Sequence, residues 1–153
     1  MLMSNPTEPP SLLAAATTQP RPCLCSALRR AARGLTRRYD AHLKPAGLKV
    51  TQYSMLANIC RNPRVAVSAL ADLMAMDQTT VTRNLQLLLR KGYVSLEPAA
   101  EDQRVRLVDL SDAGRAKLEE ALPLWRQAQA EIEQELGGLG ADVLFQSLRA
   151  LAR

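Results

Sequence analysis

A chain of 153 residues is long enough to bury a hydrophobic core within one domain. Of these residues 47% are apolar but only 3% aromatic, so the core must be built mostly from aliphatic side chains, a composition that favours helices. The net charge of +5 favours an anionic partner, and no apolar run reaches the roughly 18 residues that a membrane-spanning helix needs. We therefore expect one mainly helical domain that does not enter a membrane.

Residues 1–21 are predicted to form a disordered tail, because prolines interrupt any helix there. The segment lacks the charged start of a signal peptide, and its apolar piece, residues 12–16, is too short for one. The chain has three cysteines, an odd number that does not suit a disulfide framework. We therefore expect a protein of the reducing cytoplasm.

Apolar residues at helical spacing predict a first helix that begins near Pro22 or Cys25 and runs to about Leu43. A second helix is expected from Thr51, as its N-cap, to Asn62. The short stretch 64–67 is β-prone and is followed by a short helix with Ser68 as the expected N-cap.

Asp77 is the expected N-cap of the next helix, which closes at Gly92. Apolar and polar residues then alternate in 93–98 and 104–110, which predicts a β-hairpin. A long helix capped at Ser111-Asp112 and ending at residue 136, and a final amphipathic helix from residue 141, complete the chain.

Two helices joined by a tight turn and followed by a β-hairpin are the order of a winged helix-turn-helix, so the expected fold class is mainly α with a small β-hairpin wing. A winged domain of about 60 residues needs neither the first helix nor the last ones, whose apolar faces are best buried against a partner. The alternative is that these helices fold back on their own domain. We divide the chain into a tail (1–21), an N-terminal dimerisation helix (22–50), a winged DNA-binding domain (51–110) and C-terminal dimerisation helices (111–153).

The helix that starts after Asp77 is the candidate DNA reader. An apolar stripe, Val81, Leu85, Leu88 and Leu89, is expected to pack on the core. The other face carries hydroxyls, amides and a guanidinium, which suit base edges and phosphates in a major groove: Gln78, Thr79, Thr80, Thr82, Arg83 and Gln86. An ordinary solvated helix face would have a similar composition.

The predicted hairpin carries Arg104 near its tip and Arg106 further along the strand. An arginine on a wing can enter a minor groove, where negative potential concentrates, and Asp102 is placed to hold Arg104 extended by a charge-assisted bond. The alternative is an ordinary charged turn.

The segments LKVTQYSMLANI, TTVTRNLQLLLRKGYV and EDQRVRLVDLSDAGR resemble the MarR family of bacterial transcription regulators, and the likeness runs over about residues 24–152. The resemblance implies an obligate homodimer with intertwined first and last helices that binds a palindromic operator in double-stranded DNA, most often as a repressor. It implies major-groove contacts by Thr79, Thr80, Thr82 and Arg83, and a wing contact by Arg104. Gln103 departs from the family, which often has a basic residue there.

Three interpretations compete for Cys23 and Cys25: inert core residues, soft-metal ligands, or an oxidant-sensing thiol. On a continuous helix the two side chains point about 200° apart, so they could share an ion only if Cys23 precedes the helix, with Cys60 or a partner-chain residue as third ligand. A place in the first turn of a helix, near basic residues, favours the thiolate.

The stretch LCSALRRAARGLTRRYD is similar to the organic-peroxide sensors of the MarR family. The resemblance implies that Cys25 is the reactive cysteine, with Tyr39 at the matching spacing. Cys23 could then act as a resolving thiol if the backbone lets it approach Cys25. Two tyrosines that orient the thiol in those sensors are replaced by Arg29 and Val50.

If the cysteines are structural, the effector would be a small, aromatic anion bound near Arg29, Arg33 and Tyr53. His42 is the only histidine and is expected at a solvated position, so a histidine-based active site or His-rich metal site cannot be assembled. We therefore expect that the protein is not an enzyme and that it binds no cofactor. The rival class is a thiol redox or soft-metal protein that uses Cys23 and Cys25 and does not bind DNA.

Overall fold

The computed structural model describes residues 22–137 and 140–152. They fall into two compact units, one that ends at Leu35 and one that begins at Thr36. The tail expected at residues 1–21 lies outside the described residues. In the part of the chain that the structure describes, no helix is both long and apolar enough to span a membrane.

The first helix, α2, covers Leu24–Leu43, as expected. A 3-10 turn, η1 (Lys44–Ala46), then leads through Gly47, at φ 68°, to α3 (Val50–Arg61). The prediction that Thr51 caps α3 is wrong, because the helix begins one residue earlier. Two side chains accept from N–H groups at its start. The Oε1 of Gln52, within α3, accepts from the Lys49 N–H at 3.1 Å, and the Oδ1 of Asp40, on α2, accepts from the Val50 N–H at 2.7 Å.

The helix-turn-helix consists of α4 (Val67–Leu73) and α5 (Gln78–Arg90). Ser68 is not the N-cap of α4, because strand β1 (Val65–Ala66) runs directly into the helix and Ala66 takes the cap position. The prediction for Asp77 is confirmed, since its side chain accepts from the Thr80 N–H at 2.8 Å.

The hairpin is confirmed, with β2 at Val94–Pro98 and β3 at Arg106–Leu110. The β-prone stretch 64–67 contains strand β1, which pairs antiparallel with β3 and gives the order β1-β3-β2; this pairing was not predicted from the sequence. Val108 of β3 lies between Val65 and Leu96 in the register and is fully buried. The wing is therefore fastened to the start of α4, and not only to the end of α5.

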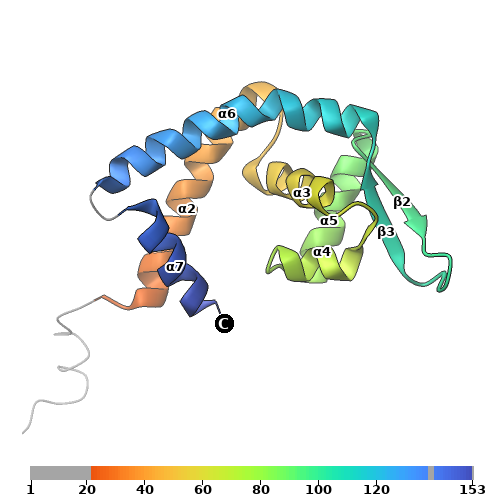
Figure 1. The fold of residues 1–153 in the computed structure, drawn as a ribbon, viewed down its shortest axis with the longest axis horizontal. Helices are drawn as coiled ribbons and strands as arrows, with labels where there is room; N and C mark the ends of the chain where they lie inside the picture. Colours follow the sequence, from red (N-terminus) through yellow and green to blue (C-terminus); the bar gives the residue numbers. More distant parts are fainter. Residues whose placement is uncertain (1–21, 138–139, 153) are drawn as a thin grey trace, which may run out of the picture. The chain divides into compact units, whose positions relative to one another are not determined.

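The long helix α6 covers Asp112–Leu136, and α7 covers Ala141–Leu151. As predicted, Ser111 caps α6, and its hydroxyl oxygen accepts from the Gly114 N–H at 3.0 Å. In Figure 1, α3, α4 and α5 are grouped beside the sheet, and α6 follows directly from β3. The core between them is almost wholly aliphatic, with fully buried side chains of Leu43, Met55, Leu56, Ile59, Leu70, Val81, Leu88 and Val108.

Candidate nucleic-acid interface

Helix α5 presents one apolar and one polar face, as its sequence pattern predicts. Val81, Leu85 and Leu88 are buried in the core, and Leu89 is half-buried against it. Because 3.6 residues make one turn, this leaves the polar residues of the first two turns on the opposite side. Five of the six predicted reader residues are exposed: Gln78, Thr79, Thr82, Arg83 and Gln86.

The sixth, Thr80, is half-buried and takes part in the cap of the helix. Its hydroxyl donates to the Oδ2 of Asp77 at 2.6 Å, while its backbone N–H donates to Oδ1. Both hydrogen bonds lower the pKa of Asp77 below its ordinary value, and the bond from the Thr80 hydroxyl has the larger effect. Since the hydroxyl proton is committed to the cap, Thr80 retains only a lone pair and its methyl group for contact with DNA.

The tip of the wing is ordered by Asp102, but not in the way that the sequence suggests. Its carboxylate accepts from the backbone N–H of Arg104 at 2.9 Å, and its carbonyl accepts from the Val105 N–H at 3.0 Å. An Asp side chain that bonds to the backbone two residues on is a frequent turn motif. The guanidinium of Arg104 forms no ion pair with any described residue, so the expected side-chain bond to Asp102 is wrong.

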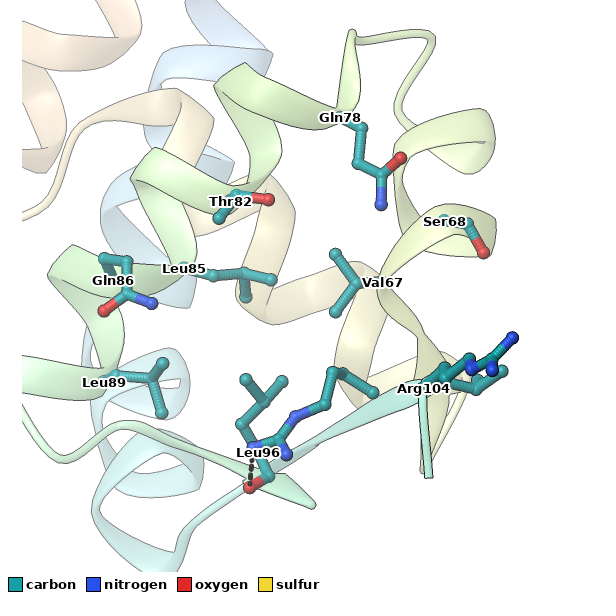
Figure 2. A pocket seen from close by; sticks show the side chains of 11 residues that line it. Val67, Ser68, Gln78, Thr82, Leu85, Gln86, Leu89, Leu96 and Arg104 are labelled. Carbon is teal, nitrogen blue, oxygen red and sulfur yellow. Dashed lines mark hydrogen bonds between the residues drawn. The ribbon is translucent and has the colours of Figure 1, made fainter. Parts of the chain in front are cut away.

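The reader helix and the wing face one shared cavity of about 270 Å³ (Figure 2). Gln78, Thr82 and Gln86 line it from α5, and Arg104 and Arg106 line it from the wing. The guanidinium of Arg106 reaches across β2 to the carbonyl oxygen of Leu96, at 3.4 Å. Two sets of polar side chains, predicted separately from the sequence, thus converge on one side of the molecule.

Ser68 also lines this cavity and is exposed, at the start of α4 (Figure 2). The sequence interpretation assigned Ser68 to a helix cap and therefore missed its place in the lining of this cavity. The place of Ser68 in the cavity follows from the position of α4 directly after β1, and no local sequence pattern indicates it.

In the unit that ends at Leu35, Cys23 immediately precedes α2 and Cys25 lies in its first turn, and both are exposed. The Ser26 backbone N–H, followed by that of Cys25, lowers the pKa of the Cys23 thiol. These observations do not support the interpretation of the pair as inert core residues. The third cysteine, Cys60, is also exposed, and no group of three or more potential metal-ligating side chains occurs among the described residues.

The predicted effector contacts have different surroundings. Arg29 and Arg33 are exposed on α2. Tyr53 is only 6% exposed and stacks on Trp125, with ring centroids 5.6 Å apart, and its burial raises its pKa. A role of these three residues in effector binding stays a prediction.

The C-terminal part of α2 is joined to α6 by polar side chains. Tyr39 also stacks on Trp125, at 6.4 Å, and its hydroxyl donates to Gln129. The prediction that His42 is simply solvated is wrong, since its Nε2 lies 3.0 Å from a carboxylate oxygen of Glu131.

Comparison with known proteins identifies the family. The family model described as "MarR family" matches residues 46–105. The structure of the Mycobacterium tuberculosis transcriptional regulator MosR in complex with DNA is 38% identical, with 85% of this chain and 93% of that chain covered and a TM-score of 0.78. The transcriptional repressor CouR, bound to a 23-mer DNA duplex, is 25% identical (86% and 93% covered, TM-score 0.79). A probable transcriptional regulator from Pseudomonas aeruginosa is 26% identical (89% and 98% covered, TM-score 0.77). The chain therefore belongs to the MarR family of transcription regulators, which are not enzymes.

Proposed function

We propose that the protein is a cytoplasmic repressor that binds a palindromic operator in double-stranded DNA as a homodimer. The observation that carries this proposal is that Gln78, Thr82 and Gln86 of α5 line one cavity together with Arg104 and Arg106 of the wing. The complex of the similar regulator MosR with DNA supports it.

The chemistry of the exposed side chains assigns their roles. The amides of Gln78 and Gln86 suit adenine and the guanidinium of Arg83 suits guanine in the major groove. Thr79 and Thr82 donate to phosphates or bases from the first turns of α5, where the helix N-terminus also attracts phosphate. Thr80 contacts DNA through its methyl group or through the remaining lone pair of its hydroxyl oxygen.

From the wing, Arg104 is free to enter the adjacent minor groove, because Asp102 holds only its backbone. The positive charge of Arg106 attracts nearby phosphates of the DNA backbone.

The homodimer is supported by apolar side chains left exposed on the terminal helices. Phe145 is 47% and Leu151 63% exposed on α7, and Leu24 is 71% exposed on α2. Faces of this kind on a soluble protein mark an association surface. A dimer with two α5 helices about 34–36 Å apart fits two successive major grooves, and hence a palindrome.

The test begins with selection of an operator from random duplex DNA, followed by titration with single variants. Arg83→Ala and Arg104→Ala are each expected to weaken binding at least about fivefold, and loss of a phosphate contact lowers the salt slope by about one. Arg126→Ala is the matched control, because it removes the same charge from an exposed position on α6. Binding that is unchanged in both interface variants, or lost equally in the control, would refute the assignment.

The cysteines support a second part of the proposal, in which oxidation releases the protein from DNA. Backbone N–H groups at the start of α2 lower the pKa of the exposed Cys23 thiol, which favours Cys23 as the thiol that attacks a peroxide. An S–O bond forms, the O–O bond breaks and hydroxide or alkoxide leaves, which yields a sulfenic acid. The Cys25 thiol then displaces water to form a disulfide. This assigns the first step to Cys23, and not to Cys25 as the resemblance to peroxide sensors implies.

Cys23 lies just before α2 and Cys25 lies in its first turn, and we propose that this turn unwinds to bring the two Cβ atoms to the roughly 3.5–4.5 Å separation that a disulfide requires. Unwinding would disturb the exposed apolar start of α2, including Leu24 and Leu28, which the dimer is proposed to bury.

Peroxide treatment is expected to abolish DNA binding of the native protein but not of Cys23→Ser, with Cys60→Ser as the control that responds like the native protein. The alkylation rate near neutral pH, measured in Cys23→Ser and Cys25→Ser, identifies the thiolate. If Cys25 alkylates faster, the order of steps is reversed. If binding never responds to oxidant, the effector is the small anion expected near Arg29, Arg33 and Tyr53.

A further inference from the structure

The chain turns sharply between α2 and α3, and this corner is held by one side chain from α2 and one from the end of α5. The Gly47 N–H donates to the Lys44 carbonyl oxygen at 2.9 Å, and Gly47 has φ 68°, in the left-handed region that favours glycine. Its own carbonyl oxygen points out of this turn and accepts a hydrogen bond from a distant residue.

That residue is Lys91, the C-cap of α5. Its Nζ donates to the Gly47 carbonyl oxygen at 3.0 Å and lies 6.0 Å from the centre of the Tyr93 ring. The C-terminal end of the proposed reader helix is thereby tied to the corner that connects α2 with α3.

The second contact comes from α2 itself. The Oδ1 of Asp40 accepts from the Val50 backbone N–H at 2.7 Å, at the first residue of α3. A carboxylate at a helix N-terminus faces the positive end of the helix dipole and forms a short, charge-assisted bond.

The same part of α2 is fixed on its other side to α6. Arg38 donates two parallel bonds to Glu135, at 2.6 and 2.7 Å, a geometry that restricts orientation as well as distance. The corner is therefore held from α2, α5 and α6 together.

We propose that Asp40 and Lys91 are positioning residues, which fix the orientation of α5 relative to the C-terminal part of α2 and so the half-site spacing that the dimer accepts. Neither residue belongs to the proposed DNA-contacting set. The inference rests on the proposed function, because spacing has meaning only for a dimer on a palindrome. One inserted base pair moves a half-site by about 3.4 Å and rotates it by about 35°, so a rigid corner discriminates between spacings and a loose one does not.

The experiment measures affinity for a series of duplexes that carry the selected half-sites at the native spacing and at one or two base pairs more or less. The native protein is expected to prefer its own spacing by about tenfold or more. Asp40→Ala and Lys91→Met are each expected to reduce this preference to about threefold or less, as loss of a hydrogen bond to a charged group allows. Affinity for a duplex with one half-site should change little.

Conservative variants separate positioning from general damage. Asp40→Asn retains an oxygen acceptor for the Val50 N–H, and Lys91→Arg retains a donor for Gly47, so both are expected to keep the spacing preference. If Asp40→Ala does not fold, Lys91→Met decides the test, because Lys91 is exposed and its removal leaves the core intact.

The outcomes distinguish the two proposals. A native protein without preference for any palindrome would overturn the proposed function. If the native protein clearly prefers one spacing, and Asp40→Ala and Lys91→Met retain that preference to within about twofold, the positioning role alone is overturned. A loss of affinity for all duplexes in equal measure would also contradict it.

Discussion

The substitution Gly114→Ala tests how the wing is joined to α6. Gly114 is buried in the first turn of α6, and a Cβ placed there would lie 1.9 Å from the carbonyl oxygen of Tyr93 and 2.9 Å from its carbonyl carbon. The obstacle is backbone, so no side chain can rotate away. The same carbonyl oxygen accepts from the Ser111 N–H at 3.1 Å, and the Ser111 hydroxyl donates to the Gly92 carbonyl oxygen at 2.6 Å.

Relief of the clash must move Tyr93 away from the start of α6. Steric overpacking costs about 1–3 kcal/mol, and the loss of the Ser111 bond adds about 1 kcal/mol. Gly-to-Ala exchange inside a helix returns at most about 1 kcal/mol through its higher helix propensity. We therefore expect a net loss of about 1–4 kcal/mol in the free energy of unfolding.

Urea denaturation followed by circular dichroism measures this loss, and Ala116→Ser is the matched control. It also adds one heavy atom to α6, but at an exposed position, and should change the free energy of unfolding by no more than about 0.5 kcal/mol. If Gly114→Ala is as stable as the native protein, the close approach of α6 to Tyr93 is not present in solution.

Three further predictions concern local features. Ala75 has φ 49° in the turn between α4 and α5, so Ala75→Gly should raise the free energy of unfolding by about 0.5–1 kcal/mol in urea melts, and a loss would contradict the strained conformation. Because its cap bonds lower the pKa of Asp77, its contribution is present above the unfolded pKa near 3.8 and is lost as pH falls through the folded value. The melting temperature of Asp77→Asn should therefore lie below that of the native protein at pH 7 and converge with it in acid. Phe145→Asp places a charge on the exposed apolar face of α7 and should yield monomers in sedimentation equilibrium, and an unchanged dimer would remove α7 from the interface.

The order of the elements could be predicted because the hydrophobic period changes clearly along the chain. Val81, Leu85 and Leu88 lie at helical spacing and are buried, and the alternation around Leu96 and Val108 marks two strands. Strand β1 has two residues, too few to show a period, so its pairing with β3 depends on tertiary structure.

The helix caps show where local patterns are insufficient. Asp77 caps α5 through its own neighbours, and the sequence identifies it. The start of α3 depends on Asp40, ten residues earlier on another helix, which overrides the local preference for Thr51. Ser68 fails for a similar reason, because β1 determines where α4 begins.

For the candidate site, the polar face of α5 follows from composition and helical spacing alone. The sequence does not reveal that Arg106 reaches the carbonyl oxygen of Leu96, or that Asp102 bonds to the backbone of Arg104, because both depend on the shape of the wing. The lowered pKa of Cys23 depends on backbone N–H groups whose direction is set only when α2 begins at Leu24.

The central claim is that α5 and the wing together recognise a specific DNA sequence. It is tested most directly by fluorescence anisotropy, in which the reduced protein is titrated at physiological salt against its selected palindrome and against a scrambled duplex of the same length and base composition. We expect the palindrome to bind at least about 1,000-fold more tightly than the scrambled duplex. Equal affinity for the two duplexes would contradict the account.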